Sequence, residues 1–354
     1  MAHQTVGVYS ETAPGERRVA LVPAAVGSVL DLGLAVVVET GAGRGAWFPD
    51  SAYTRAGART VPRAELFDAA DILIGVRPPN VAATHRFRAG QALVCLLQPL
   101  HVPDLIRRWA GQGLTTIAAD LMPPTPGRAG PMDLFAAQER IAGYQATLSA
   151  AGLFGRCLAE PGPGPPARVL VVGRGPAGLQ AAATARRLGA VVHVRAARPG
   201  SGAARPGFGA DLAASVRGSD IVIVTAETPG GQPPELVSAR SIRSMRPGSV
   251  VLDTTAGALG RAVELAQPGG TRVVEPGVTV VGDDNLASRT PTGASTAYAT
   301  SVAALLTHLV RDGALSIDRT DPAQAAVVVT HHRDVLNDAV WQRILDQISL
   351  AGLP

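Results

Sequence analysis

The feature that most constrains the fold is a glycine-rich segment near the middle of the chain. Gly173, Gly175 and Gly178 follow an aliphatic run at 169–172 and open an alanine-rich helical stretch. The first glycine permits a tight strand-to-helix turn, the second lets the backbone approach a pyrophosphate, and the third lets helix and strand pack closely. The start of such a helix presents free N–H groups and a positive dipole end to phosphates. The segment therefore predicts a dinucleotide-binding α/β domain.

Short apolar runs alternate with helical patterns on both sides of this segment. We expect strands at residues 6–9, 35–39, 72–76, 94–97 and 115–118, and then at 169–172, 191–195, 221–225, 250–253, 278–281 and 325–330. Helices are expected at residues 23–32, 133–158, 295–310 and 338–348. Strands that alternate with helices are typical of parallel, doubly wound sheets.

The proline- and glycine-rich stretch 161–166 separates two α/β halves of the chain. We expect two Rossmann-like domains joined by long helices. Residues 1–135 and 312–354 would form a discontinuous first domain, and residues 136–311 the dinucleotide-binding domain. The ligand crevice should lie between the domains, at the carboxyl ends of the strands of the second sheet.

Composition excludes several classes of function. All 32 basic residues are arginine, so no lysine can form a Schiff base or act as an acid or base. The arginines are scattered and only 4% of residues are aromatic, which gives no support for nucleic-acid binding. Two cysteines and the lack of an apolar run of about 18–20 residues indicate a reduced, cytoplasmic protein without a membrane span.

A metal site is not predicted. His331 and His332 are adjacent in a region expected to be a strand or to follow one, and neighbouring strand residues point to opposite faces. Without further Cys or His residues at ligand spacing, the pair is not expected to hold a metal ion.

Several blocks of sequence occur in a characteristic order. They are GERRVALVP at 15–23, VETGAG at 38–43, IAGY at 141–144, the glycine segment, 225–230, MRPGSVVLD at 245–253, SRTPT at 288–292 and VVTH at 328–331. Together they resemble the family of alanine dehydrogenase and the NAD(H)-binding alpha component of proton-translocating nicotinamide nucleotide transhydrogenase. The resemblance implies an oxidoreductase that transfers hydride at nicotinamide C4, forms a homodimer, and can work with a separate membrane and NADP(H)-binding component to which it is peripheral.

The transhydrogenase branch of this family is the closer one. Alanine dehydrogenases use a lysine, a histidine and an aspartate around pyruvate, and the matching residues here are Arg77, Gln98 and Gly257. Arg18 matches the family's carboxylate-binding arginine. Arg77 can hold a carboxylate by a bidentate fork, but its pKa is too high for the proton transfer done by lysine. The alternative function is therefore an NAD(P)H-dependent dehydrogenase or reductase of an amino, imino or keto acid gripped by Arg18 and Arg77.

Part of the family's nicotinamide-site motif is missing. Arg128 and Asp133 match an arginine and an aspartate of that motif, whereas Thr125 and Gly130 replace an arginine and a glutamine. The resemblance places Arg128 and Asp133 beside the nicotinamide ring. They could equally form an ion pair at a helix start, where aspartate is a preferred cap. A third function follows from the losses: a catalytically weakened protein that senses or sequesters the cofactor.

Cofactor choice should depend on the end of the second strand of the dinucleotide-binding domain. The family has an acidic residue there that binds the adenosine ribose, and this chain has Ala196, with Arg195 and Arg198 beside it. An acid would repel a 2′-phosphate, and nearby arginines favour one. Both NAD and NADP are candidates, and we expect tolerance of NADP rather than strict preference for NAD.

The remaining expected cofactor contacts lie at strand ends. Pro176 and Ala177 complete the glycine segment, Thr225 and Ala226 end one strand, and Asp253 ends another. Asp253 has an alternative role, because an aspartate in this position commonly binds the turn that follows it.

Overall fold

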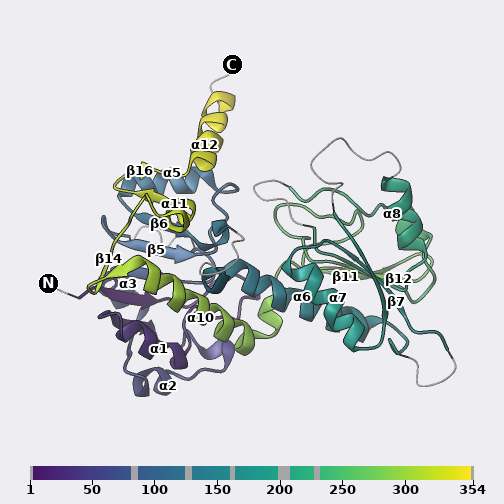
Figure 1. Cartoon of the computed structure of the whole chain (residues 1–354), viewed down its shortest axis with the longest axis horizontal. Coiled ribbons are helices and arrows are strands. Elements are labelled where there is room, and N and C mark those ends of the chain that lie inside the picture. The colour runs from purple at the N-terminus through teal and green to yellow at the C-terminus, as the bar shows by residue number, and fades with distance from the viewer. Residues whose placement is uncertain are drawn as a thin grey trace. The chain divides into compact units, whose positions relative to one another are not determined.

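The computed structural model describes residues 3–80, 87–123, 130–159, 164–197, 208–226 and 232–351. The chain divides into two compact units (Figure 1). Unit 1 consists of Met1–Gln138 and Pro291–Pro354, and unit 2 of Glu139–Thr290. Each unit is an α/β structure around its own sheet, and unit 1 is discontinuous in sequence, as expected.

Unit 1 contains a mixed sheet of eight strands within the described residues. In sheet order the strands are β16 (Asp334–Val335), β15 (Val328–His331), β6 (Thr115–Ala118), β5 (Ala92–Cys95), β4 (Ile72–Ile74), β1 (Thr5–Val8), β2 (Ala35–Glu39) and β3 (Arg59–Val61). The six strands from β6 to β3 are parallel, and the hairpin β15–β16 joins β6 in antiparallel fashion. A separate small ladder pairs β13 (Val310–Arg311) with β14 (Ala314–Leu315).

Helices cover both faces of this sheet. They are α1 (Pro23–Leu30), α2 (Asp50–Arg55), α3 (Arg63–Ala69), α5 (Pro103–Gln112), α10 (Pro291–Leu309), α11 (Pro322–Val327) and α12 (Asp338–Ala351), with short 3₁₀ turns η1 (Arg44–Ala46), η2 (Ala119–Leu121) and η3 (Gly130–Met132). Successive strand residues point to opposite faces. Val36 and Val38 accordingly pack in the core with α1 and α10, and Val37 packs in the core with α3 and α5.

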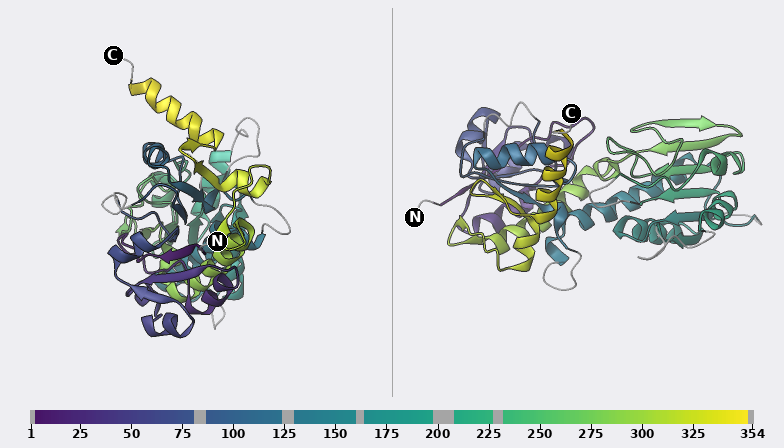
Figure 2. Two further views of the ribbon diagram at one scale, coloured as in Figure 1. Left: turned by 90° about the vertical axis from the view of Figure 1, so that its left-hand side faces the viewer. Right: turned by 90° about the horizontal axis from the view of Figure 1, so that it is seen from above.

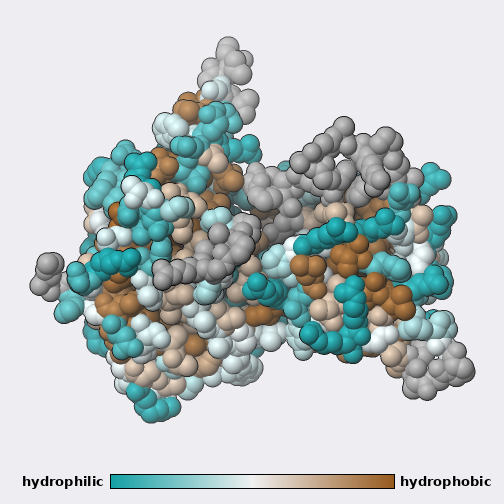
Figure 3. Space-filling model, in the orientation of Figure 1, coloured by the Kyte–Doolittle hydropathy of each residue, from teal (hydrophilic) through white to brown (hydrophobic). Residues whose placement is uncertain are grey.

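The C-terminal helix α12 extends away from the sheet of unit 1 (Figures 1 and 2). Val340 and Ile344 anchor it in the core that also contains Trp109 of α5. Trp341, Leu345 and Ile348 are exposed by 46%, 38% and 51%, and apolar residues are visible on its surface in Figure 3. Among the side chains described on α12, Val340 and Ile344 are the buried ones that pack against unit 1.

Two expectations about the chain after residue 290 were wrong. Helix α10 belongs to unit 1 and not to the dinucleotide-binding domain, because Tyr298, Val302 and Leu305 are buried in the core of unit 1. The late strand expected at 325–330 is split: α11 ends at Val327 and β15 starts only at Val328. Asp321 caps α11 through the N–H groups of its first turn, which favours helix over strand at this point.

Unit 2 contains a six-stranded sheet in the order β11 (Thr271–Val274), β12 (Val278–Gly282), β10 (Val250–Asp253), β9 (Ile221–Val224), β7 (Arg168–Val172) and β8 (Val191–Arg195). Its helices are α7 (Pro176–Arg187), α8 (Phe208–Arg217), α9 (Ala239–Arg243) and α6 (Leu134–Leu153), which starts in unit 1, with η4 (Leu286–Arg289). All strands are parallel except the edge strand β11, which was not predicted.

The strand order places a topological switch at β7. Its neighbours are β8 on one side and β9 on the other, so the chain leaves β7 in one direction and later returns on the opposite side. Ligands of open α/β sheets bind at such a point, outside the carboxyl ends of the strands. The glycine segment follows β7 directly. In the described part of the chain, no helix has the length and apolar character needed to cross a membrane.

Candidate functional site

The glycine loop, residues 173–178, joins β7 to α7. At two of its glycines, any side chain would force neighbouring atoms of the protein to move. Gly173 has φ +133°, and a Cβ on it would collide with Thr225 at the end of β9. A Cβ on Gly178 would collide with the carbonyl group of Gly173. The loop is thus folded tightly against its own helix and the neighbouring strand, which is the packing predicted from the glycine spacing.

Gly175 differs from the other two glycines of the loop. It caps the start of α7 with extended backbone, φ −69° and ψ −179°, and a Cβ on it would meet no described atom within 4 Å. No side chain of the described residues caps this helix start. Pro176 has no N–H to satisfy, so the donors of the next residues remain for an anion. The absence of a Cβ at Gly175 keeps this space clear.

Helix α6 packs against the start of α7, where the glycine loop ends. A Cβ on Gly143 would collide with the backbone of Ala177 at the start of α7. Thr147, one turn further along α6, donates a hydrogen bond of 3.1 Å from its hydroxyl to the carbonyl of Ala181. The first of these contacts explains the glycine of the IAGY block, because Gly143 lets the two helices touch backbone to backbone.

The residues expected around the adenosine ribose lie at the end of β8. Ala196 directly follows the strand and is partly exposed, and Arg195 is exposed, with Nη2 3.2 Å from Ser215 Oγ. Gly173 N donates to the carbonyl of Arg195 at 2.9 Å, so this strand end lies next to the glycine loop. Arg198 lies outside the described residues. The expected tolerance of NADP stays a prediction.

The strand ends at Thr225 and Asp253 have structural contacts. Thr225 N donates to Val172 O at 2.8 Å, which places Thr225 and Ala226 beside the loop, and Ala226 is only 2% exposed. Asp253 is completely buried, and burial raises the pKa of its carboxyl despite four hydrogen bonds to it. Those bonds come from Thr255 N, Thr255 Oγ1, Ala262 N and Val263 N. They favour the turn-binding role of Asp253 over contact with a ligand.

In unit 1, the arginines Arg18 and Arg77 converge on an internal carboxylate. Arg18 donates from Nε to Glu16 Oε1 at 2.7 Å and from Nη2 to Glu16 Oε2 at 2.6 Å, and its Nη1 donates to Gln138 Oε1 at 2.9 Å. Arg77 Nε donates to Glu16 Oε2 at 3.3 Å. We call Glu16, Arg18, Arg77 and Gln138 the arginine–glutamate cluster. The sequence pattern does not single out Glu16, although it lies within the GERRVALVP block.

At the centre of the cluster, Glu16 and Arg18 form a buried ion pair. Arg18 is 5% exposed and the Glu16 side chain is fully buried. Burial acts to raise the pKa of Glu16, but the hydrogen bonds and charge of Arg18 outweigh it and lower this pKa to about 2. The same contact raises the pKa of Arg18 against the effect of its burial. The bidentate edge of Arg18, which a substrate carboxylate would use, is therefore occupied by Glu16.

A second carboxyl group, Glu11, fixes the backbone of Arg77. Its oxygens accept hydrogen bonds from Val76 N at 2.6 Å and Arg77 N at 3.3 Å. The hydroxyl of Tyr9 donates to Arg77 O at 2.5 Å. Burial raises the pKa of Glu11 to about 8, although the backbone hydrogen bonds oppose this shift. Nothing in the sequence pattern marked Glu11 or Tyr9, because their partners lie more than sixty residues away.

The two residues expected beside the nicotinamide ring have separate outcomes. Asp133 Oδ1 accepts a hydrogen bond of 2.8 Å from Ala136 N, so Asp133 caps the start of α6, as the alternative interpretation expected. Arg128 lies outside the described residues. Their catalytic role stays a prediction.

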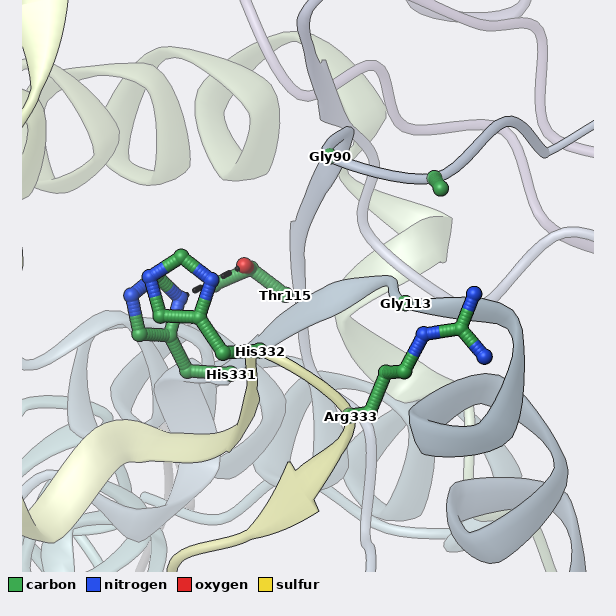
Figure 4. A pocket seen from close by; sticks show the side chains of 7 residues that line it. Gly90, Gly113, Thr115, His331, His332 and Arg333 are labelled. Atoms are coloured by element: carbon green, nitrogen blue, oxygen red, sulfur yellow. Dashed lines mark hydrogen bonds between the residues drawn. The ribbon is translucent and has the colours of Figure 1, made fainter.

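The expectation that the side chains of His331 and His332 point to opposite faces was wrong. Their rings lie 3.8 Å apart between centroids, on the same side of the chain (Figure 4). β15 ends at His331, and His332 has φ +48°, so the chain turns before strand alternation can separate the two side chains. Among the described residues, no group of three or more His, Cys, Asp or Glu side chains could hold a metal ion.

Comparisons with known proteins agree with the blocks in the sequence. The N-terminal domain model of the alanine dehydrogenase/PNT family matches residues 7–142, and its C-terminal domain model matches residues 146–338. The chain is 35% identical to NAD(P) transhydrogenase subunit alpha of Cereibacter sphaeroides, covering 92% of this chain and 70% of that one. It is 32% identical to alanine dehydrogenase of Mycobacterium tuberculosis, covering 70% and 71%.

The structure shows the same relationship. A transhydrogenase from Sinorhizobium meliloti superposes with a TM-score of 0.86 at 36% identity, covering 94% of this chain and all of that one. The glycine loop, the tight contact of α6 with α7 and the two α/β units thus occur in a chain that belongs to the alanine dehydrogenase/PNT family.

Proposed function

We propose that this chain is a nicotinamide-dinucleotide oxidoreductase similar to the alpha component of transhydrogenase. The observation that carries the proposal is the glycine loop of unit 2. At Gly173 and Gly178, the protein's own backbone and Thr225 occupy the space that a side chain would need. At Gly175 the described residues leave that space open, and it lies next to N–H groups of α7 that no described side chain caps. Such a site fits a pyrophosphate.

The roles of the chain's own residues follow from this fit. A bound nicotinamide cofactor supplies a C4 position that gives or takes a hydride. The first turn of α7 would hold the pyrophosphate, and Gly143 and Gly178 keep that turn fixed by close packing. Hydride transfer between two rings needs proximity and orientation more than an acid or a base. A chain without lysine can therefore support it.

The alternative use of Arg18 and Arg77 for a carboxylic acid substrate is not favoured. Both arginines already bind Glu16, and Arg18 does so with the bidentate edge of its guanidinium. A substrate carboxylate at Arg18 would have to displace a buried internal carboxylate, whereas Arg77 is 37% exposed and contacts Glu16 through Nε alone. Reduction of an amino, imino or keto acid therefore ranks below hydride exchange between nucleotides.

A binding protein without turnover is the second candidate function. Asp133 is engaged as a helix cap, and Gly130 and Ala136 carry no polar side chain next to it. The finer parts of the proposal are tolerance of NADP because of Ala196, a homodimer in the cytoplasm, and a separate membrane-associated chain as the partner that holds the second nucleotide.

A deuterium-transfer assay tests the proposal. The protein, together with the membrane-associated component that holds the second nucleotide and separately without it, is incubated with NADH that carries deuterium at C4 and with acetylpyridine adenine dinucleotide as acceptor. Parallel samples contain pyruvate or glyoxylate in place of this acceptor, and all products are analysed by mass spectrometry. Transfer of deuterium into the acceptor, with none lost to water, is expected. Binding of NADH without transfer, with or without the membrane component, would support the second candidate. Transfer only to pyruvate or glyoxylate would overturn the proposal.

A further inference from the structure

A cavity of about 290 Å³ in unit 2 adjoins the glycine loop. The residues that line it are Arg140, Arg174, Pro176, Leu179 and Gln180. Arg174 belongs to the glycine loop, Arg140 to α6, and the other three to the first two turns of α7. Sites for small molecules usually have volumes of about 300–1,000 Å³, so this cavity has room for part of a dinucleotide and not for all of it.

The glycine loop fixes the point from which the side chain of Arg174 starts. Gly173 before it packs against the end of β9, and Gly175 after it caps α7. The carbonyl of Gly175 accepts a hydrogen bond of 3.0 Å from Leu179 N, so the helix is formed from its first turn. Because Arg174 shares the cavity with Pro176 and Leu179, its side chain lies along this first turn.

Arg140 reaches the same cavity from α6. It precedes Gly143 by three residues, and residues three apart lie on the same face of a helix. At Gly143 the backbone of α6 approaches the backbone of Ala177, so Arg140 lies on the face of α6 that is turned toward the start of α7 (Figure 1). The two guanidinium groups therefore line one cavity from two elements that are packed together.

This arrangement concentrates positive charge at the positive end of a helix. Acidic residues stabilise the start of a helix and cations oppose its dipole there, yet the first turn of α7 has no acidic residue and the cavity beside it has two arginines. Both arginines are exposed, and within the described residues neither guanidinium has a hydrogen bond or an ion pair. Glu139 adjoins Arg140 in sequence but does not line the cavity. An anion from solution would balance this charge.

We propose that Arg140 and Arg174 bind the pyrophosphate of the dinucleotide together with the N–H groups at the start of α7. A guanidinium has a permanent charge and a planar set of donors that matches phosphate oxygens, and the pyrophosphate has one negative charge on each phosphate. Pro176 and Leu179 give the cavity an apolar side, which suits the ribose carbons next to the phosphates. The inference rests on the function proposed for the glycine loop and adds two charged residues to that site.

Calorimetric titration of NADH into three variants tests the inference. Arg174→Gln and Arg140→Gln should each weaken NADH binding by about tenfold, because a charged hydrogen bond to the pyrophosphate is lost. Arg186→Gln is the control, at an exposed arginine in the last turn of α7, and should bind like the parent. ADP-ribose should show the same losses as NADH, since it has the pyrophosphate but no nicotinamide. Added salt should weaken NADH binding more in the parent than in the double variant.

Two results would overturn the inference and leave the proposed function standing. One is equal NADH affinity in the parent, Arg140→Gln and Arg174→Gln. The other is a loss for NADH without a loss for ADP-ribose, because the arginines would then act on the nicotinamide part of the cofactor.

Failure of the proposed function is recognised separately. If the parent does not bind NADH, that function fails, and titration with inorganic pyrophosphate at low ionic strength decides the inference. Saturable pyrophosphate binding that Arg174→Gln weakens and Arg186→Gln does not would support an anion site formed by the two arginines. Pyrophosphate binding that is undetectable, or equal in both variants, would overturn it.

Discussion

The two units differ in whether their polar groups have partners within the protein. In unit 2, the glycine loop ends at uncapped N–H groups with space beside Gly175. In unit 1, the arginine–glutamate cluster buries the charges of Glu16 and Arg18, which satisfy each other, and the partly exposed Arg77 adds a further contact with Glu16. A group without a protein partner indicates a ligand, whereas a matched pair indicates a structural role even when its residues resemble a family's substrate site.

This contrast bears on the choice between functions that the sequence leaves open. Arginines that resemble a carboxylate-binding pair would indicate a carboxylic acid substrate if they were unpaired. Because Glu16 occupies the bidentate edge of Arg18, the pairing supports our proposal that the dinucleotide site in unit 2, and not a carboxylic acid site in unit 1, carries the function. This comparison would fail if disrupting the cluster left the free energy of unfolding unchanged. It would also fail if a larger side chain in the glycine loop left dinucleotide affinity unchanged.

The largest expected effect is on the arginine–glutamate cluster. Glu16→Gln leaves the buried Arg18 without its counter-charge, and losing one partner of a buried pair costs about 3–5 kcal/mol. Urea unfolding measures the free energy of unfolding. Glu65→Gln is the matched control, because Glu65 and Arg59 form an exposed pair of the kind that contributes about 0–1 kcal/mol. Equal effects of the two substitutions would show that Glu16 is not a structural counter-ion.

The second expectation concerns the pH dependence of stability. The pKa of Glu11 is about 8 in the folded protein against an ordinary value of 4.5, so the folded state binds the extra proton between these values. Stability should therefore fall as pH rises from 4.5 to 8, by up to about 1.4 kcal/mol per pH unit. Glu16 acts oppositely: its stabilisation is present above pH 4.5 and is lost as pH falls toward 2.

The variant Glu11→Gln separates these two contributions. It should flatten the decline in the free energy of unfolding between pH 4.5 and 8 and leave the acid limb intact. Unfolding curves collected at intervals of half a pH unit would show this. An unchanged slope in the variant would mean that Glu11 is ionised in the folded state at neutral pH.

The third expectation concerns packing behind the glycine loop. Gly178→Ala forces a methyl group against the carbonyl of Gly173, and overpacking of this kind costs about 1–3 kcal/mol. Gly155→Ala is the control in the same unit, because a Cβ there meets no described atom within 4 Å. Thermal unfolding compares the two. If both variants match the parent, the loop is looser than its contacts indicate.

The fourth expectation concerns cofactor choice. Ala196→Asp should move the ratio of NAD to NADP affinity toward NAD by about 1–3 kcal/mol, because the carboxylate accepts from ribose hydroxyls and repels a 2′-phosphate. Isothermal titration with NADH and NADPH measures the ratio. Arg217→Gln, at an exposed arginine of unit 2 on α8, serves as a control for general charge effects. A constant ratio would show that the end of β8 does not contact the ribose.

The elements that could be predicted from the sequence are those whose residues favour a single type of secondary structure. Four of the expected strands, at 35–39, 115–118, 191–195 and 250–253, have those bounds in the structure. The alanine-rich segment before Val328 suits helix as well as strand, so its division between α11 and β15 depended on the cap at Asp321. The edge strand β11 has alternating exposure and contains only two valines, which left no apolar run to detect.

The candidate sites divide in the same way. The glycine loop was predictable because the spacing of its glycines, together with the flanking strand and helix patterns, indicates this turn directly. The arginine–glutamate cluster was not, since Arg18 finds Gln138 120 residues away and Glu11 finds Val76 65 residues away. The contact of His331 with His332 depends on a positive φ at a non-glycine residue, which residue type did not predict.

The most direct test of the account is a titration of NADH into Gly175→Val and its control Gly155→Val. A Cβ at either position meets no described atom within 4 Å, and the backbone of Gly175 is extended, so both variants should fold like the parent, which circular dichroism and thermal unfolding check. The account predicts that Gly175→Val loses NADH binding, because the branched side chain fills the space kept for the pyrophosphate, while Gly155→Val binds normally. Undiminished affinity of a folded Gly175→Val variant would contradict the assignment of the glycine loop as the dinucleotide site.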